Sequence, residues 1–320
     1  MSSFHNYYTT NNTCCQDDDV LHDYRADGRR ERPWARYKII NQYYALAYDD
    51  INPKKADRLR NCATFLKFKV GDGGMKLHEA NFCRVRLCPI CAWRRSLKTY
   101  SQVRACVNVI GKTHRFIFAT FTIPNVNGDC LSDSISKLLI GFNRLIKYKA
   151  ISKINKGYYK GLEISHNISN NTFHPHLHVL FAVTPSYFSG RTYLSQDKWL
   201  YYWRKAMQDN NIKIVDVRTV KGKPEHACAE IAKYSVKPAD IIDFDDWDYT
   251  VDTISVLDSA LANRRLIGYG GIFKDVHKQL HLDDSENGDL IHTDIDSMSD
   301  DDVKTIAYGW NVGYSQYRRI

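Results

Sequence analysis

The hydrophobic and polar positions change their period several times along the chain, and each change predicts an element. Residues 63–82 alternate around the turn signal GDGG, which predicts a β-hairpin. Residues 114–124 form an apolar, β-rich run typical of a buried central strand, and residues 131–150 place apolar side chains at helical spacing. The remaining predicted elements are strands at 157–166 and 174–183, a helix at 196–209 with Ser195 as N-cap, a strand at 212–220 and a helix at 225–236.

From residue 114 onward the order of these elements is βαββαβα. This order predicts an α+β fold with the ferredoxin-like, RRM-like split βαβ arrangement, in which helices pack on one face of an antiparallel sheet, plus one additional helix. The chain then divides into an irregular arm at 1–60 with one helix near 33–47, a zinc-binding hairpin and basic helix at 61–113, a core with C-terminal helices at 114–282, and an acidic, partly disordered tail at 283–320.

Charge is unevenly distributed along the sequence. The formal net charge is +9, but residues 283–302 hold nine acidic residues and no Lys or Arg, so the remainder carries +18. This excess favours a polyanionic partner, most simply nucleic acid, although many basic proteins use their charge only for solubility. We find no run of membrane-spanning length and no signal-peptide pattern, and therefore expect a cytoplasmic protein without membrane contact, whose nine cysteines are thiols or metal ligands.

Three histidines alternate in the stretch FHPHLHVLFAV, at His174, His176 and His178. Side chains two apart on a strand share a face, so the three imidazoles would form one row. If the strands on either side of the loop NISNNT pair symmetrically, Glu163 lies opposite His176. One carboxylate and two imidazoles then come within reach of a single divalent ion and leave coordination positions open for substrate.

Other interpretations of the histidine row remain open. His174 could replace Glu163 as the third ligand. The three histidines could instead be hydrogen-bonded surface residues on an edge strand. A zinc hydrolase of the His-x-His-x-Asp-His type would want Asp where Leu180 stands, and an iron oxygenase would usually place its second histidine far along the chain.

The stretch EIAKYSVK places Glu230 and Tyr234 four residues apart, which predicts that they share one helical face. The tyrosine side chain has a pKa of about 10, so it is a poor nucleophile unless its oxygen is positioned and the electrophile is polarised. A phosphodiester bound to a divalent ion meets that need. The alternative, which holds for most of the 21 tyrosines, is a packed ring with an exposed hydroxyl.

A cysteine cluster predicts a second, structural metal site. The spacing C-x20-C-x4-C-x2-C is formed by Cys62, Cys83, Cys88 and Cys91. Four thiolates around Zn²⁺ would give a closed site that clamps the predicted hairpin onto the following basic helix, with His78 as a substitute ligand.

Basic residues near the two predicted sites are candidates for DNA contact. They are Arg94, Arg95 and Lys98, which follow the cysteines, and Lys233 and Lys237, which flank Tyr234. Such residues typically contact phosphates. The alternative for the helix after the cysteines is a solvated basic face with Trp93 packed inward.

Four stretches carry a resemblance to a known family. In chain order they are RLCPICAWRRSLK (86–98), FTIPNV (121–126), HPHLHVLFAV (174–183) and EIAKYSVK (230–237). Together they resemble the rolling-circle replication initiator (Rep) proteins of small bacterial plasmids, within the endonucleases named for a His-hydrophobic-His motif. The resemblance covers roughly residues 62–280.

This resemblance implies a nicking endonuclease with defined roles. His176 and His178, on either side of Leu177, would bind Mg²⁺ or Mn²⁺. Tyr234 would attack the origin phosphodiester, remain linked to the 5′ phosphate and free a 3′ hydroxyl for priming, while Glu230 would assist the water that ends the last round.

The resemblance also implies partners and leaves competing functions to be weighed. The implied partners are plasmid origin DNA, a host helicase and a DNA polymerase in a bacterial cytoplasm; a homodimer stays open. One competing function is a zinc-stabilised DNA-binding regulator without chemistry. Another is a small-molecule iron or zinc enzyme, against which the charge, EIAKY and the cysteine cluster all argue.

Overall fold

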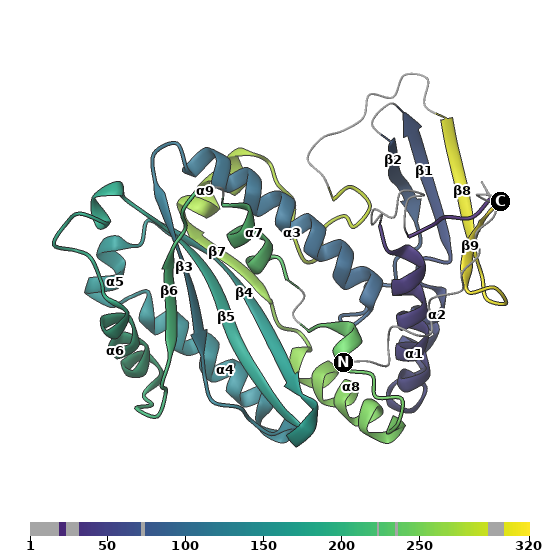
Figure 1. Ribbon diagram of the computed structural model, residues 1–320, viewed down its shortest axis with the longest axis horizontal. Helices are drawn as coiled ribbons and strands as arrows, with labels where there is room; N and C mark the ends of the chain where they lie inside the picture. The colour runs from purple at the N-terminus through teal and green to yellow at the C-terminus, as the bar shows by residue number, and fades with distance from the viewer. Residues whose placement is uncertain (1–18, 24–31, 72–73, 223, 234–235, 294–303) are drawn as a thin grey trace.

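The computed structural model describes residues 19–23, 32–71, 74–222, 224–233, 236–293 and 304–320. This part of the chain is mixed α+β, with two antiparallel sheets at opposite ends of the molecule (Figure 1). The helices are α1 (Trp34–Ile51), α2 (Pro53–Asn61), α3 (Pro89–Ile110), α4 (Gly128–Leu145), α5 (Lys149–Ile154), α6 (Gln196–Met207), α7 (Glu225–Ile231), α8 (Trp247–Leu261) and α9 (Ile272–Gln279). The strands are β1 (Phe65–Gly71), β2 (Gly74–Ala80), β3 (Arg115–Thr122), β4 (Gly157–Asn167), β5 (Thr172–Val183), β6 (Val215–Thr219), β7 (Ile267–Gly271), β8 (Lys304–Asn311) and β9 (Gln316–Arg319). None of the helices within these ranges is long and apolar enough to cross a membrane.

The larger sheet has the strand order β6-β3-β5-β4-β7, and all its neighbours are antiparallel. Strands β4 and β5 form a hairpin in which Glu163 pairs with His176, so the symmetric register expected from the sequence is confirmed. The edge strand β7 was not predicted. Its sequence, IGYGG, contains three glycines. Glycine is depleted in strands, so this composition gave no strand signal.

Helices cover both faces of this sheet, so the prediction that they lie on one face is wrong. On the first face, Phe121 of β3 packs against Phe142 of α4 and Trp203 of α6, with ring centroids 6.3 and 4.9 Å away. On the second face, α3, α7 and α9 pack against Phe116, Tyr159, Leu180 and Ala182. The reason is that β5 is apolar at every position after His178, and a strand that is apolar on both sides must be covered on both.

The smaller sheet has the order β2-β1-β8-β9 and joins the hairpin before α3 to the two C-terminal strands. The predicted hairpin is present as β1 and β2, and β8 pairs with β1 so that Phe68 lies opposite Ile306. The expectation of a solvated, partly disordered tail is therefore wrong for the described residues 283–293 and 304–320. Tyr308 and Tyr317 are buried against the hairpin, because the last residues alternate like a strand although the preceding stretch is acidic.

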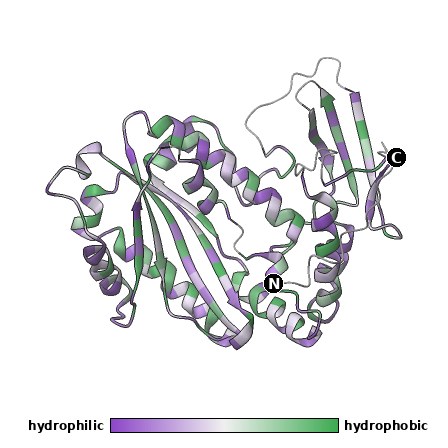
Figure 2. Cartoon of the chain, in the orientation of Figure 1, coloured by the Kyte–Doolittle hydropathy of each residue, from purple (hydrophilic) through white to green (hydrophobic). Residues whose placement is uncertain are grey.

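Several helices differ from their predicted bounds. The predicted helix near residues 33–47 is α1, but α2 was missed and makes the irregular arm partly regular; it begins with the N-cap Asn52, whose side chain accepts from the backbone N–H of Lys55. The predicted helix 131–150 is divided between α4 and α5, and α7 ends at Ile231 rather than continuing to residue 236. Figure 2 shows that hydrophilic and hydrophobic residues are interspersed along most of these helices.

Candidate metal centres

The histidine row lies on the second face of the five-stranded sheet, on β5. His178 Nε2 is 2.8 Å from Glu163 Oε2, and His176 Nε2 is 3.4 Å from the same oxygen. The three residues are buried, each less than one-tenth exposed, and one ligand atom from each lies within 4.8 Å of the others. His174 is not part of this group among the described residues. The geometry thus favours Glu163 over His174 as the third ligand.

The two imidazoles are held with the same nitrogen facing the centre. His176 Nδ1 lies 3.1 Å from the carbonyl oxygen of His174, to which it can donate, and His178 Nδ1 lies 3.2 Å from Thr120 Oγ1. These contacts leave both Nε2 atoms directed at Glu163, the orientation that metal-ligating histidines adopt when their other nitrogen is hydrogen-bonded. Thr120 was missed in the sequence. Its signal was a threonine on the face of β3 that also carries Phe116 and Phe118.

The carboxyl of Glu163 is poised to be a ligand. Burial alone would raise the pKa of Glu163, but hydrogen bonds and charge interactions from His176 and His178 outweigh burial and hold this pKa well below its usual range. The group is therefore an anion at neutral pH. Burial lowers the pKa of the neighbouring His174, which keeps that imidazole neutral.

The donor set fits a divalent ion. Two imidazole nitrogens and one carboxylate oxygen are ligands for first-row divalent metals and Mg²⁺, and three protein ligands leave positions for water or a phosphate oxygen. The side chains converge from two adjacent strands of one hairpin, so a rigid backbone fixes their spacing. Glu163, His176 and His178 are the residues that would hold the ion.

Helix α7 ends beside the histidine row because β4 carries no side chain at Gly161. Gly161 pairs directly with His178 across the two strands. A Cβ atom at Gly161 would lie 2.7 Å from the carbonyl oxygen of Ile231, the last residue of α7. Only glycine permits this approach, and it brings the chain that leaves α7 next to the candidate ligand His178.

The residues expected to work with Tyr234 are described, but Tyr234 itself lies outside the described residues. Lys233 Nζ donates to the carboxylate of Glu230 at 2.6 Å, and both side chains are about two-fifths exposed. Lys237 is exposed and 3.9 Å from the carboxylate of Asp240. Since α7 ends at Ile231, the expectation of one continuous helix through residue 236 does not hold. Helical spacing therefore no longer supports the prediction that Glu230 and Tyr234 share one face.

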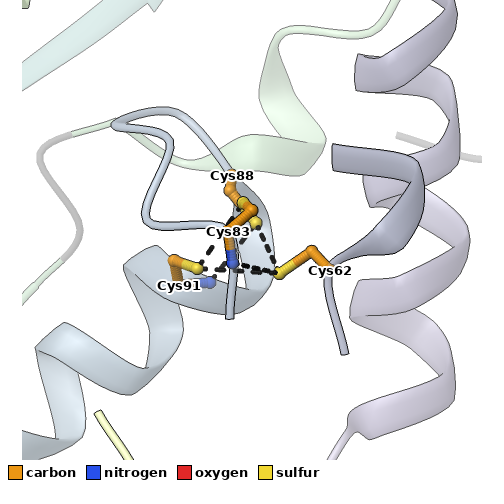
Figure 3. Close-up of side chains that lie close together, drawn as sticks. All are labelled: Cys62, Cys83, Cys88 and Cys91. Carbon is orange, nitrogen blue, oxygen red and sulfur yellow. Dashed lines mark hydrogen bonds between the residues drawn. The ribbon is translucent and has the colours of Figure 1, made fainter. Parts of the chain in front are cut away.

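The four cysteines form a second, compact cluster (Figure 3). The Sγ atom of Cys62 is 3.6 Å from that of Cys88 and 3.7 Å from that of Cys91, and the Sγ atoms of Cys83 and Cys91 are 3.8 Å apart. Four sulfurs held at about 2.3 Å from a central Zn²⁺ in a regular tetrahedron would be about 3.8 Å apart. The spacing therefore fits tetrahedral zinc. His78 is not part of this group within the described residues.

Each of the four sulfurs accepts a backbone N–H. The donor–acceptor pairs are Cys83 N to Cys62 Sγ at 3.4 Å, Val85 N to Cys83 Sγ at 3.5 Å, Cys91 N to Cys88 Sγ at 3.5 Å, and Arg84 N to Cys91 Sγ at 3.3 Å. Amide donors aimed at sulfur stabilise thiolates more than thiols, because hydrogen bonds to a charged acceptor are stronger. Burial, together with the neighbouring sulfurs of Cys62, Cys83 and Cys91, raises the pKa of Cys88, so a bound cation would be needed to keep this sulfur deprotonated.

Two buried polar residues on α1 support the cysteine cluster and were not anticipated. Lys38 is fully buried and donates from Nζ to the carbonyl oxygens of Arg60 and Cys62, at 2.8 and 2.6 Å. Asn41 Nδ2 donates to the carbonyl oxygen of Leu59 at 2.6 Å. These bonds fix the turn that presents Cys62. No sequence signal marked them, since a lysine in a helix is ordinarily exposed.

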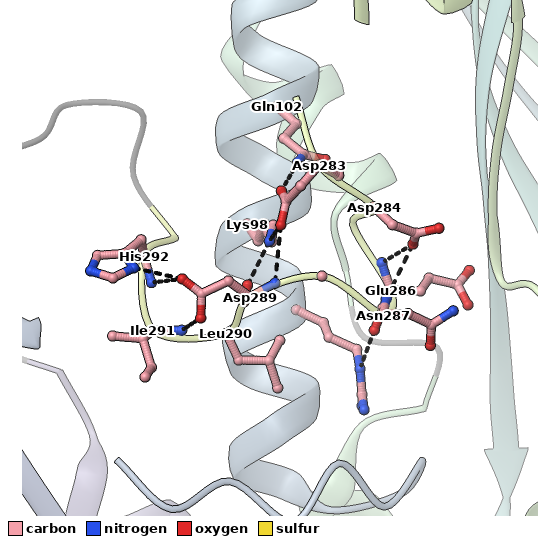
Figure 4. Close-up of polar contacts among 12 residues, drawn as sticks. Lys98, Gln102, Asp283, Asp284, Glu286, Asn287, Asp289, Leu290, Ile291 and His292 are labelled. Atoms are coloured by element: carbon pink, nitrogen blue, oxygen red, sulfur yellow. Dashed lines mark hydrogen bonds and ion pairs between the residues drawn. The ribbon is translucent and has the colours of Figure 1, made fainter. Parts of the chain in front are cut away.

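Helix α3 was expected to face DNA, and that expectation is wrong for Arg94 and Lys98. Arg94 is fully buried and donates from Nε to the carbonyl oxygen of Leu290 at 2.9 Å. Lys98, only 3% exposed, forms an ion pair with Asp283 and donates to the carbonyl oxygen of Asp289 at 2.5 Å (Figure 4). The segment 283–293 thus provides partners for both side chains from within the chain.

The same segment engages the flanking basic residues. Arg95 is half-buried and donates to the carbonyl oxygen of Glu286 at 3.2 Å. The carboxylate of Glu286 accepts the backbone N–H groups of Leu266 and Ile267, both at 2.6 Å, and is 3.1 Å from Arg86. Trp93 packs inward, edge to face with Trp34, as the alternative interpretation predicted. These contacts hold the acidic segment 283–293 against α3 and the residues beside it, as a structural strap does.

Comparisons with known proteins show which family the chain resembles. The model of a family described as "Replication protein" matches residues 74–318. "Protein rep" of Bacillus amyloliquefaciens is 37% identical over 94% of this chain and 97% of the relative, and "Protein rep" of a Bacillus species is 41% identical over 79% and 87%. "Protein rep" of Streptococcus pneumoniae is 36% identical over 94% of this chain and 95% of that relative. No solved structure matches the chain.

Proposed function

The chain belongs to the replication protein family of plasmid Rep initiators, and we propose that it is a metal-dependent DNA nicking-joining endonuclease that starts rolling-circle replication. The observation that carries this proposal is the convergence of His176 Nε2, His178 Nε2 and Glu163 Oε2 beside the end of α7. It combines a divalent-ion ligand set with the chain segment that leads to Tyr234.

The core topology supports the same assignment. The segments β3-α4-β4-β5-α6-β6 occur in the chain order of a split βαβ unit, and the spatial order β6-β3-β5-β4 is the one such a unit adopts. We therefore assign a ferredoxin-like, His-hydrophobic-His endonuclease core, extended by β7 at one edge. In this core His176 and His178 sit on the central strand β5, and Glu163 sits on its neighbour β4.

The proposed reaction is a phosphodiester transesterification. The phenolic oxygen of Tyr234 forms a bond to the scissile phosphorus while the bond from phosphorus to the 3′ oxygen breaks. The phenol loses its proton and the 3′ oxygen takes one up, so the products are a 5′-phosphotyrosine link and a free 3′ hydroxyl. When bound, a Mg²⁺ or Mn²⁺ ion supplies polarisation of the phosphate oxygens. Glu163, His176 and His178 hold it, and Thr120 orients His178.

Termination needs a water nucleophile, and we assign Glu230 to it. A carboxylate can orient and deprotonate a water, and positioned proton transfer contributes about 10²- to 10⁴-fold. Lys233 lies against this carboxylate and can release it when a DNA phosphate takes the ammonium. Glu230→Ala should therefore still nick and join DNA but should yield replication products longer than one unit. Loss of the initial nick in this variant would assign Glu230 to cleavage instead.

The remaining assignments concern zinc and DNA. We propose one structural Zn²⁺ bound by Cys62, Cys83, Cys88 and Cys91, with origin DNA contacted near the active site by Lys233 and Lys237. A host helicase and DNA polymerase would follow the nick in the bacterial cytoplasm, where plasmids replicate.

The direct test is covalent trapping on supercoiled origin plasmid with Mg²⁺ or Mn²⁺. Wild-type protein should nick the plasmid and form a protein–DNA adduct resistant to denaturation, and Tyr234→Phe should bind the origin without forming an adduct. An adduct of undiminished yield in this variant, mapped to another tyrosine, would refute the nucleophile. Origin binding without any nicking by wild type would favour the second candidate, a zinc-stabilised DNA-binding regulator, which the cysteine cluster would support equally well.

A further inference from the structure

Helices α5 and α6 form a basic surface at the end of the molecule opposite the small sheet (Figure 1). Residues 144–160 contain six basic residues and no acidic one. Five of the six are exposed, namely Arg144, Lys147, Lys149, Lys153 and Lys156. This is the reverse of α3, where the described acidic segment covers the basic side chains. The charge on α5 is open to a polyanion in solution.

Tyrosines lie among these lysines. Tyr148 and Tyr202 are 5.9 Å apart by ring centroids, and Lys205 Nζ lies 5.4 Å from the Tyr148 ring, which ties α6 to the start of α5. Tyr201 is 58% exposed and borders a surface hollow that is also lined by Asp197, Leu200, Arg204, Lys205 and Asn210. An exposed ring beside a hollow with cations and hydrogen-bonding groups can stack a base and contact its phosphate. A surface that served only solubility would explain the exposed lysines but not the exposed tyrosine ring.

A basic path joins this surface to the histidine row over the edge strand β6. Arg218 of β6 pairs with Phe118 of β3, and the Phe118 ring stacks on His178 at 5.5 Å. Lys213 and Arg218 are exposed at this edge, and Arg218 also forms an ion pair with Asp216 at 2.8 Å. From there α6 is adjacent, since Arg204 Nε donates to the carbonyl oxygen of Ile212 at 2.7 Å.

We propose that the α5–α6 surface is a second DNA contact of the protein and takes single-stranded DNA. Phosphates would lie against Lys149, Lys153 and Lys205, with a base stacked on Tyr201. Only an unpaired base exposes a face for such stacking, which is why a single strand fits better than a duplex. The inference rests on the proposed nicking function, because the nicked strand has to leave the histidine row, and the path over β6 leads to this surface.

The experiment measures binding of a fluorescent 30-nucleotide oligo-dT across a salt series. Lys149→Glu/Lys153→Glu/Lys205→Glu should weaken binding more than 10-fold and should reduce the slope of log affinity against log salt by about 2, at about 0.7 per lost phosphate contact. Tyr201→Ala should weaken binding about 5- to 100-fold with an unchanged salt slope. Nicking of a short origin oligonucleotide that reaches only the histidine row should stay within about twofold of wild type.

Matched controls separate this surface from net charge and general exposure. Lys54→Glu/Lys278→Glu/Lys304→Glu changes the net charge equally at exposed positions elsewhere, and Tyr314→Ala removes another exposed ring. Both controls should bind oligo-dT nearly as wild type does. Equal weakening by the two triple variants, or a loss seen with duplex DNA but not with oligo-dT, would overturn the proposal. A wild-type protein that never nicks but loses oligo-dT binding through the α5–α6 variants would refute the proposed function and leave this surface standing.

Discussion

The two clusters of metal-ligating side chains differ in how completely the protein surrounds them. The cysteine cluster offers four sulfurs at tetrahedral spacing, and each sulfur already accepts a backbone N–H. The histidine row offers two nitrogens and one oxygen on one face of a sheet and leaves the other coordination positions to water or substrate. The first arrangement suits an ion that holds structure, and the second suits an ion that meets a substrate.

The difference follows from the backbone that carries each cluster. Three of the cysteines lie within nine residues, on a loop and the first turn of α3, and the fourth lies at the end of α2, so the metal would join separate elements. The histidine row stands on a hairpin that is already fixed by its hydrogen-bond register. Removing metal should therefore loosen the first region and leave the second folded. Each prediction below tests that contrast.

The largest expected effect is the loss of a cysteine ligand. Cys88→Ser or Cys91→Ser should lose the zinc and strongly destabilise the region of the small sheet, because apparent zinc-binding free energies of about 10–16 kcal/mol in zinc-finger peptides are folding free energies. Metal analysis and thermal unfolding of freshly purified protein measure this. The matched control is Cys130→Ser, an exposed thiol outside the cluster, which should keep one zinc per chain. A wild-type protein without zinc would contradict the assignment.

A histidine substitution should separate activity from stability. His178→Ala and His176→Ala should each abolish metal-dependent nicking yet cost no more than about 3 kcal/mol of stability, since the hairpin remains paired. His174→Ala removes the neighbouring imidazole that lies outside the group and should retain most of the nicking activity. The pair of measurements is the nicking rate and the melting temperature. If His174→Ala were as inactive as His178→Ala, the third ligand would be His174 rather than Glu163.

A smaller effect is expected from the residue behind His178. Thr120→Val keeps the shape of the side chain but removes the oxygen that lies 3.2 Å from His178 Nδ1. Losing such a partner typically lowers metal affinity about 10- to 100-fold. Nicking titrated with Mn²⁺ should therefore need more metal and reach nearly the wild-type rate at saturation. Thr219→Val, an exposed position on the neighbouring strand β6, serves as the control, and an identical shift in both variants would contradict the role of Thr120.

The smallest effect is the acid stability of the metal-free protein. Because the pKa of Glu163 is depressed in the folded state, the folded protein binds this proton less readily than the unfolded chain does. The contribution is thus complete above the unfolded pKa of about 4.3 and is lost as the pH falls below it. Denaturant unfolding between pH 6 and pH 3 should show wild type losing on the order of 1 kcal/mol more than Glu163→Gln. Parallel pH profiles would contradict the depressed pKa.

Local signals in the sequence predicted the hairpins and the ligand row. The loop NISNNT and the alternation on both sides fixed the register that places Glu163 opposite His176, and the spacing of the four cysteines marked their cluster. Both depend on residues close in sequence or on one hairpin. Such features are readable because the backbone itself sets the geometry.

Features that depend on distant partners were not predictable. Strand β8 pairs with β1, which lies more than 200 residues earlier in the chain. The amino-acid composition of β8 does not indicate which strand it pairs with. Burial of Arg94 and Lys98 follows from the acidic segment 283–293, so a helix that looks DNA-facing by sequence is internal. Thr120 and Lys38 matter only because of what lies opposite them in the fold.

The most direct test of the contrast between the two centres is one chelation experiment with two readouts. Protein dialysed briefly against EDTA should lose origin nicking, regain it on addition of Mn²⁺ or Mg²⁺, and retain one zinc per chain and its melting temperature throughout. This result would show an open, exchangeable catalytic ion beside a closed, structural one. Nicking that persists in EDTA, or nicking that disappears only when zinc and the folded state are lost together, would contradict the account.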